Sequence, residues 1–347
     1  MLKIVGDVNF SDGYFDLGIG VGTRIRNGAD PFCHLDRRPG DFWIGNFECV
    51  CASLAIGKPF IISPKELDHV KLLDLFGVAN NHVMQYGEDA YREMLGYLDK
   101  KDILYAGSDE HRSVNFEYQG KKIGVLAFSQ RPDNFTRLPL YWSLPEYDEI
   151  KTEIARLSGC DFKIAYIHWG NEFINYPYND QKQFAHFLVD SGIDLVIGMH
   201  PHVMQGFEIY HGKHIFYSLG NFVFYMPWLP TKYSIIVNVD FETDKLITIE
   251  YVRIGNDNFP RIVSNVPQEY SMEYLNGLLA IDEENEKYYA KVARCYKQYR
   301  KINRRTIMRD FLHMENKYRI SIIKDFINRR FEYFYQQNVF DHICSFN

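Results

Sequence analysis

The sequence has no long apolar run. Across its 347 residues, no stretch approaches the roughly 20 consecutive apolar residues that span a bilayer. The first residues, Met1-Leu2-Lys3-Ile4, lead into a strand-like run without the charged and then apolar leader of an export signal. We therefore expect a cytoplasmic protein, either free or peripheral to the membrane, with no signal peptide and no transmembrane segment.

Cysteines are few, and they have no spacing typical of a disulfide framework or a zinc ribbon. The six are Cys33, Cys49, Cys51, Cys160, Cys295 and Cys344. Free thiols in a reducing compartment are the simpler interpretation.

A dinucleotide-binding fingerprint is also absent. The run Gly18-Ile19-Gly20-Val21-Gly22 lacks the later glycine of that motif. Arg24 and Arg26 follow it, and we interpret them as solvated side chains rather than as ligands of an anionic substrate. No nucleic-acid-binding module is recognisable, so we expect no nucleic-acid partner.

The length and the 46% hydrophobic content allow one large core and a small additional unit. Apolar periodicity predicts helices over residues 65–76, 89–100 and 181–191, and these alternate with strand-like runs. Such alternation is typical of a largely parallel sheet. Residues 235–239 and 246–252, separated by a polar turn at Glu242-Thr243-Asp244, predict an antiparallel hairpin that closes a second sheet.

Two histidines, His200 and His202, follow the apolar run Val196-Ile197-Gly198-Met199. Residues spaced i, i+2 at a strand end point the same way and can share one binding centre. Further polar residues also follow strand-like runs, namely Asp7, Glu48, the pair Asn81 and His82, and His168. Because an open α/β sheet gathers its ligands beyond the carboxyl ends of its strands, we expect these side chains to meet.

This mixed oxygen and imidazole set suits a pair of borderline divalent ions, Mn, Fe or Zn. Each residue alone has a simpler interpretation. Asp7 alone fits a cap or a turn, and His168 alone fits a hydrogen-bonded core histidine beside Trp169. The recurrence at five strand ends favours a metal centre.

Four strings of residues carry a family resemblance: Asn46-Phe47-Glu48; Ala79-Asn80-Asn81-His82 with Tyr86-Gly87 behind it; His168-Trp169-Gly170-Asn171-Glu172; and His200-Pro201-His202-Val203 through Ile215-Phe216-Tyr217-Ser218-Leu219-Gly220-Asn221-Phe222. From about residue 3 to residue 240 the chain resembles the CapA (PgsA-type) family of poly-γ-glutamate capsule synthesis, which is related in fold to calcineurin-like metallophosphoesterases. The resemblance implies an α/β fold, a two-sheet α/β/β/α sandwich of metallophosphatase type, with a dinuclear metal centre at one edge.

The phosphoesterase pattern implies that Asp7 and His202 hold one ion, that Asn81, His168 and His200 hold the other, and that Glu48 bridges them. Asn9 stands where the phosphoesterases have histidine, so the first ion is expected to be held more weakly. Gln85 stands where the CapA pattern commonly has aspartate. Asn9-Phe10 likewise stands where the CapA pattern more usually has Met-Leu, and neither of these two departures from the CapA pattern removes a predicted ligand.

His82 follows a predicted ligand and is the candidate catalytic residue, as general acid or electrostatic partner of a phosphoryl oxygen. A role in hydrogen bonding to the ligands is the alternative. Asn9, Asn80, Glu172 and Asn221 are candidates for contact with substrate or for support of the ligands. A polar residue in such a loop is also often a turn former.

The composition changes towards the C-terminus. Residues 287–347 contain 14 Lys and Arg against 5 Asp and Glu, although the whole chain has a net charge of −6. We predict a metallophosphatase domain over residues 1–264 and a basic, aromatic helical extension over residues 265–347, with helices at 288–310 and 320–335. The extension is either a layer packed on the domain or a docking surface for an acidic partner, an anionic polymer or the cytoplasmic leaflet.

Together these features predict a metal-dependent, phosphoesterase-like hydrolase in the biosynthesis of a capsule or another surface polymer. Its expected partners are an anionic polymer or phosphorylated substrate and a membrane-bound polymer synthase, which the basic extension would contact. The alternative is a non-catalytic assembly subunit of the synthase, with structural metals or none.

Overall fold

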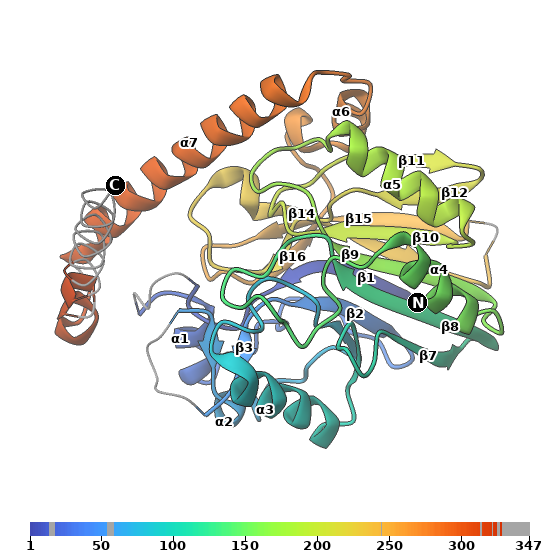
Figure 1. Ribbon diagram of the computed structural model, residues 1–347. Helices are drawn as coiled ribbons and strands as arrows, with labels where there is room; N and C mark the ends of the chain where they lie inside the picture. The colour runs from blue at the N-terminus through green and yellow to red at the C-terminus, as the bar shows by residue number, and fades with distance from the viewer. Residues whose placement is uncertain are drawn as a thin grey trace, which may run out of the picture.

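Two β-sheets lie face to face at the centre of the molecule (Figure 1). The computed structural model describes residues 1–13, 18–53, 59–243, 245–312, 314–320, 322–324 and 327. In spatial order, the first sheet contains β16 (Pro260–Val263), β15 (Ile247–Ile254), β14 (Tyr233–Val239), β1 (Leu2–Val8), β2 (Phe42–Phe47), β5 (Leu75–Gly77) and β6 (Leu104–Ala106), and β13 (Asn221–Val223) also pairs with β1. The second contains β11 (Phe207–Tyr210), β12 (Lys213–Phe216), β10 (Leu195–Met199), β9 (Phe162–His168), β8 (Lys121–Ser129) and β7 (Ser113–Tyr118).

Parallel strands form the middle of each sheet. Strands β1, β2, β5 and β6 run parallel in the first, and β8, β9, β10 and β12 run parallel in the second. The predicted hairpin of β14 and β15 is antiparallel. It extends the sheet that contains β1 rather than the one that contains β9 and β10. A separate pair, β3 (Val50–Cys51) and β4 (Ile61–Ile62), lies beyond β2.

Helices cover both outer faces of the sandwich (Figure 1). On the first sheet lie α1 (Val21–Arg26), α2 (Pro64–Leu67) and α3 (Gly87–Lys100), and on the second lie α4 (Tyr147–Arg156) and α5 (Asn179–Asp190). One hydrophobic core fills the space between the sheets, where Ile4 and Ile44 pack with Ile164 and Ile197. The predicted α/β/β/α sandwich is confirmed.

The helix predictions over residues 89–100 and 181–191 are confirmed by α3 and α5, and each buries one apolar stripe. The helix predicted over residues 65–76 is wrong. Only one turn forms, α2, which begins at the capping box of Ser63 and Glu66, and Leu75–Gly77 is a strand. The buried Leu72 and Leu73 repeat at helical spacing with Leu75, but they pack from an irregular segment under the sheet.

The chain after β16 is helical and packs on the domain. It forms a short 3-10 turn (Gln268–Tyr270), α6 (Met272–Leu278) and α7 (Asn285–Phe311). In α7, Tyr288 is 1% and Tyr299 is 5% exposed, so this helix is anchored at two points. The helix predicted at 288–310 is confirmed, and most of the one predicted at 320–335 lies outside the described residues. The division into domains at residue 264 stays a prediction.

Two further expectations concern thiols and membranes. The five cysteines in the described ranges are free, and Cys344 lies outside those ranges. Within the part of the chain that the structure describes, no helix combines the length and apolarity needed to cross a membrane.

Candidate metal centre

Polar side chains from five chain segments converge at one edge of the sandwich. Asp7 is near the end of β1, and Glu48 directly follows β2. His168 ends β9, and His200 directly follows β10. Asn81 comes from the loop after β5, and His202 lies two residues beyond His200. All six are at most 3% exposed. The strands of both sheets therefore end at one buried polar cluster, as the sequence predicts.

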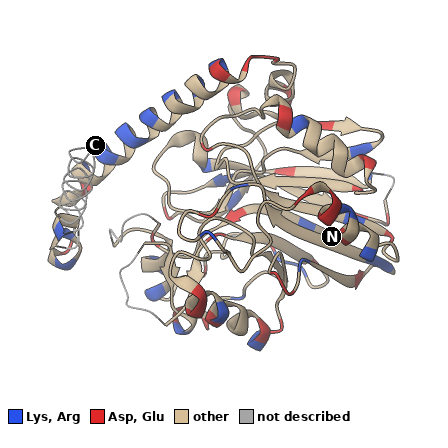
Figure 2. Cartoon of the chain, viewed as in Figure 1, with Lys and Arg blue, Asp and Glu red and all other residues tan. Residues whose placement is uncertain are grey.

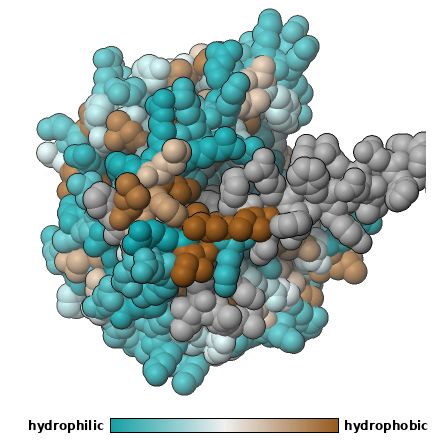
Figure 3. Space-filling model, turned by 90° about the vertical axis from the view of Figure 1, so that its left-hand side faces the viewer, coloured by the Kyte–Doolittle hydropathy of each residue, from teal (hydrophilic) through white to brown (hydrophobic). Residues whose placement is uncertain are grey.

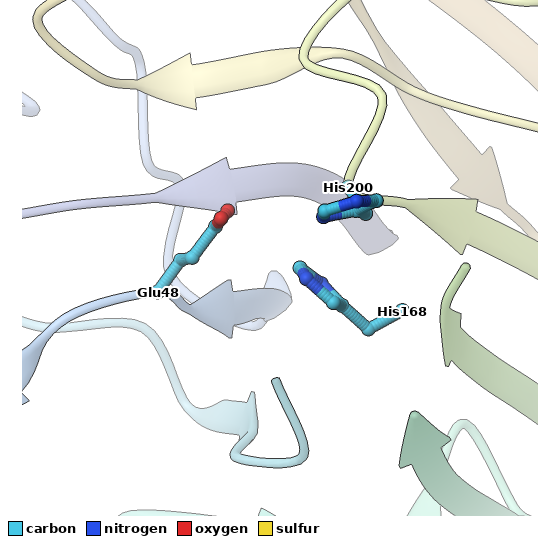
Figure 4. A group of neighbouring side chains, drawn as sticks. All are labelled: Glu48, His168 and His200. Carbon is cyan, nitrogen blue, oxygen red and sulfur yellow. The ribbon is translucent and has the colours of Figure 1, made fainter. Parts of the chain in front are cut away.

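Glu48 lies at the centre of this cluster. The potential metal-binding atoms form two groups, and within each group all the atoms lie within 4.8 Å of one another. The first group comes from Glu48, His168 and His200, and the second from Asp7, Glu48 and His202. Figure 4 shows the Glu48 carboxylate pointing towards the neighbouring rings of His168 and His200. Glu48 belongs to both groups, which is the arrangement that a bridging ligand requires.

Two glycines allow the strand ends to come this close. A Cβ atom on Gly6 would lie 1.8 Å from the carbonyl oxygen of Gly220, so only glycine lets the chain before β13 pass against β1 beside Asp7. A Cβ on Gly198 would lie 2.1 Å from Nε1 of Trp169. That indole donates to the carbonyl oxygen of Tyr217 at 2.9 Å and fixes the start of the loop after His168.

Amide side chains hold Asp7 and His168 in place. The Asn46 amide donates to Oδ1 of Asp7 at 2.8 Å and lies 3.3 Å from Nδ1 of His168. Asn80 fixes the orientation of Asn46, because its amide donates to Oδ1 of Asn46 at 3.1 Å and to the carbonyl oxygen of Phe47 at 2.9 Å. Nε2 of His168 lies 2.8 Å from Oδ1 of Asn81. Asn80 therefore supports the cluster from behind and is not directed to a substrate.

Asn221 orients His202. Its Nδ2 donates to the carbonyl oxygen of Thr231 at 3.3 Å, so its Oδ1 faces Nδ1 of His202 at 2.9 Å. An amide oxygen only accepts, which places the imidazole proton on Nδ1. Nε2 then keeps its lone pair on the side of Glu48, whose Oε1 is 3.6 Å away. The candidate pocket residue Asn221 is thus a positioning residue for a histidine.

The loop after β10 has an uncommon backbone. His200 has φ of 96° and His202 has φ of 58°, values that L-residues seldom adopt. Such conformations cost of order 1–3 kcal/mol each and persist where the surroundings impose them. Here the His200 N–H donates to Oδ2 of Asp7 at 3.3 Å, and both histidine rings are buried in the cluster.

Burial and neighbouring charges set the ionisation of the cluster. Burial and the nearby Asp7 carboxylate raise the pKa of Glu48 well above its usual range. Burial also opposes the charged form of Asp7, but the hydrogen bond and the charge of His202 outweigh it and lower the pKa of Asp7. Burial lowers the pKa of His168 to about 3 and that of His200 well below its usual range. Burial also opposes the charged form of His202, but its hydrogen bond to Asp7 and the Asp7 charge outweigh burial and raise the pKa of His202. The cluster thus combines the neutral imidazoles of His168 and His200 with the paired Asp7 and His202, and with Glu48, whose charged form burial disfavours.

His82 lies beside the cluster in a fixed orientation. Its ring stacks on Phe60 with centroids 3.8 Å apart, its Nδ1 is 3.3 Å from Oε1 of Gln85, and its Nε2 is 4.0 Å from Oε1 of Glu48. Burial lowers the pKa of His82 to about 3. Because the Gln85 oxygen accepts from Nδ1, a lone pair on Nε2 faces the cluster, and His82 would need a second proton to act as a general acid.

Asn9 and Glu172 differ in their relation to the cluster. Oδ1 of Asn9 accepts from the N–H of Ser11 at 2.8 Å and from its hydroxyl at 2.6 Å, and this turn leaves Nδ2 buried without a partner among the described residues. As oriented, Asn9 offers no oxygen to an ion. Glu172 is buried, its Oε2 has no described hydrogen-bond partner, and burial raises its pKa.

Sequence reasoning assigned no role to several residues of the cluster. Asn46 was noted only as part of a quoted string and Gln85 only as a departure from the CapA pattern, and their orienting contacts depend on the fold. Arg131, in the loop after β8, carries a positive charge that acts to lower the pKa of Glu172, His168 and His200. Nothing in the local sequence around Arg131 indicates that it lies near this edge.

The buried donor atoms fit divalent cations. Both carboxylate oxygens of Glu48 and both ring nitrogens of His200 are buried and have no hydrogen-bond partner among the described residues. Buried polar groups are almost always paired, so such orphans need an explanation. A divalent ion would supply the missing partner for both residues and compensate the charge of the carboxylates. The ligand assignment itself stays a prediction.

The comparisons of sequence agree on one family. The family model described as bacterial capsule synthesis protein PGA_cap matches residues 3–226. The chain is 32% identical over 228 residues to the PGA biosynthesis protein CapA of Bacillus subtilis, covering 58% of this chain and 57% of that protein. It is 31% identical over 202 residues to the capsule biosynthesis protein CapA of Bacillus anthracis, covering 52% and 47%. Among solved structures, a novel phosphatase from Mycoplasma pneumoniae aligns with 73% of this chain and 93% of its own, at 16% identity and a TM-score of 0.45.

Proposed function

Because the chain belongs to the bacterial capsule synthesis protein family, we propose that it acts as a metal-dependent, phosphoesterase-like hydrolase in the assembly of a surface polymer of the poly-γ-glutamate type. The matches span about half the length of each Bacillus relative. The proposal therefore concerns the chemistry of this chain and does not extend to everything those proteins do.

One observation supports the proposal above the others. A fully buried carboxylate, Glu48, has no hydrogen-bond partner among the described residues and faces histidines on two sides. A purely structural cluster would pair this group or replace it with an apolar residue, since an unpaired buried charge is costly. Asp7, Glu48 and His202 would hold one divalent ion, and Asn81, His168 and His200 would hold the other with Glu48. Mn, Fe and Zn suit this donor set.

Bound there, two divalent ions would activate water at neutral pH and stabilise negative charge on phosphoryl oxygens. The chain supplies the rest. Asn221 keeps the proton of His202 on Nδ1, and Asn46 holds the Asp7 carboxylate. The stacked ring of His82 presents Nε2 beside Glu48, where it can accept a proton or a hydrogen bond from a bound group. Arg131 contributes positive charge near the same edge.

The basic helix α7 is the proposed contact with an anionic partner. Figure 2 shows Lys and Arg positions along its length, and Arg304 and Arg305 are exposed. Met308 and Leu312 are 76% and 75% exposed near its end. The face on this side of the molecule gathers apolar side chains near its centre (Figure 3). A cationic and apolar surface of this kind suits an anionic polymer or a polymer synthase at the membrane surface.

The test combines metal content with turnover. Protein purified without chelator should contain Mn, Fe or Zn and hydrolyse bis-p-nitrophenyl phosphate. His200→Ala and His168→Ala should each remove most of one metal equivalent, because no neighbour replaces the lost imidazole. If wild-type protein binds no metal after reconstitution, the proposed metal-dependent hydrolase activity is rejected. Full metal loading without turnover of any phosphoester would favour an assembly subunit with structural metals.

A further inference from the structure

A second polar cavity lies away from the metal centre, between the end of α7 and the body of the protein. Its volume is about 720 Å³, which is in the range of small-molecule sites. One wall comes from α7 and the residues that follow it, and includes Arg309 and Tyr318. The other comes from the body, with Arg24, Tyr225 and Lys232. A Cβ on Gly18 would lie 2.5 Å from the Tyr318 ring, so only glycine allows the two walls to meet this closely.

The body wall presents two cationic groups that form no ion pair with a carboxylate of the described residues. Nζ of Lys232 donates to Oδ1 of Asn258 at 3.2 Å, and no carboxylate among the described residues forms an ion pair with it. Arg24 donates through Nη2 to the carbonyl oxygen of Asn256 at 3.3 Å, and its Nε is buried without a described partner. These contacts are to neutral oxygens only. Neither side chain therefore has a direct acidic partner among the described residues.

Further donors point to the same conclusion. The hydroxyl of Tyr225 is buried and has no hydrogen-bond partner in the described ranges. Burial lowers the pKa of Lys232 to about 8, and the charge of Asp257 opposes this shift without outweighing it. On the opposite wall, Arg309 is paired with Asp310 at 2.6 Å and adds no net charge. The acidic Glu315 of that wall is paired with Lys317 at 3.0 Å. Among the described lining residues, the charged or donor groups without an ionic partner are thus Lys232, Arg24 and the Tyr225 hydroxyl.

We propose that this cavity binds a small oxyanion, a molecule that carries a phosphate or carboxylate group, held by Lys232, Arg24 and the Tyr225 hydroxyl. Charge-assisted hydrogen bonds from ammonium and guanidinium groups are the contacts that both anions prefer. The site is distinct from the metal centre, although consecutive residues contact both. The Phe224 and His202 rings pack with centroids 4.9 Å apart, and the next residue, Tyr225, lines the cavity. The inference does not depend on hydrolase activity.

The experiment measures binding of inorganic phosphate and of glutarate to chelator-treated protein by isothermal titration calorimetry. Removing the metals keeps the metal centre from contributing, so this test is separate from that of the proposed function. Wild type should bind at least one probe, and the stronger of the two identifies the source as a phosphate or a carboxylate. Lys232→Met should weaken that binding about tenfold or more, because it removes a charge-assisted contact.

Two further variants make the outcome decisive. Lys100→Met, at the exposed end of α3, is the matched control and should bind as wild type does. Tyr225→Phe removes only the hydroxyl and should weaken binding severalfold while the fold is kept. Binding of neither probe by wild type overturns the proposal. Equal binding by wild type, Lys232→Met and Tyr225→Phe overturns it as well, since the anion would then lie elsewhere.

Discussion

Replacing Asn221 with leucine tests whether His202 depends on this amide. Oδ1 of Asn221 accepts from Nδ1 of His202 at 2.9 Å, and this contact leaves Nε2 as the unprotonated nitrogen on the Glu48 side. Leucine has a similar volume but offers no acceptor. Loss of a partner that orients a ligating histidine typically lowers metal affinity by about tenfold to a hundredfold. Oδ2 of Asp7 remains 3.4 Å from Nδ1 and retains part of the orientation.

We therefore expect Asn221→Leu to lower metal affinity by about tenfold, the lower limit of that range, which corresponds to about 1.4 kcal/mol. Asn221→Leu should also lower the free energy of unfolding by about 1–3 kcal/mol, because the buried carbonyl oxygen of Thr231 loses its donor. The assay is titration of Mn²⁺ or Zn²⁺ into chelator-treated protein, followed by calorimetry.

Two variants separate orientation from stability. Asn221→Asp keeps an acceptor for Nδ1 and should bind metal at least as tightly as wild type. Asn238→Leu removes a buried asparagine of β14 that contacts Lys3 and Glu250, far along the chain from any predicted ligand. It should lower stability and leave metal affinity unchanged. Unchanged metal affinity in Asn221→Leu would refute the role assigned to Asn221.

Three more predictions follow from individual residues. Because Asn9 offers no oxygen to an ion, titration of metal into chelator-treated protein should show one tight and one weaker binding event. Asn9→His should strengthen the weaker event by roughly tenfold to a hundredfold. Two equally tight events that Asn9→His leaves unchanged would contradict the ligand assignment. The raised pKa of Glu48 means that metal-free protein loses stability as the pH rises above the unfolded pKa of about 4.5 towards the folded pKa. In thermal unfolding, Glu48→Gln should therefore stabilise metal-free protein more at pH 8 than at pH 5. An equal effect at both pH values would count against a buried unpaired carboxylate. Reversing the exposed charges with Arg304→Glu and Arg305→Glu should abolish salt-sensitive binding to anionic vesicles and leave metal content intact, whereas unchanged binding would leave α7 as a packed structural layer.

The distal half of α7 suits this last test better than removal of the helix. Tyr299 stacks on Phe173 with centroids 4.3 Å apart, and Tyr288 lies 5.7 Å from Tyr176. A chain cut at residue 285 would expose both aromatic contacts. If that shortened chain were insoluble, the cause would be the loss of these packing contacts and not the loss of a surface that binds anionic vesicles.

The convergence of the candidate ligands could be predicted from the sequence because it depends on a local signal. Each of Asp7, Glu48, His168 and His200 follows an apolar run, and parallel strands bring such positions to one edge. The supporting contacts could not be predicted. Asn221 reaches His202 only because β13 pairs with β1, and a three-residue strand gives no periodic signal.

The errors have similar causes. In residues 65–76, buried leucines of an irregular segment repeat at helical spacing, and β5 is too short to show alternation. Arg24 and Arg26 look like solvated side chains in the sequence. In the folded chain, Arg26 pairs with the buried Asp12, and Arg24 lines the cavity beside α7. Long-range contacts, which residue patterns do not encode, decide both positions.

A crystal structure of protein loaded with Mn²⁺, with anomalous scattering measured at a wavelength where manganese contributes, is the most direct test of the metal centre. The account predicts two anomalous peaks on either side of the Glu48 carboxylate, one beside Asp7 and His202 and the other beside Asn81, His168 and His200. The absence of any peak at Glu48 in crystals soaked with excess metal would contradict it.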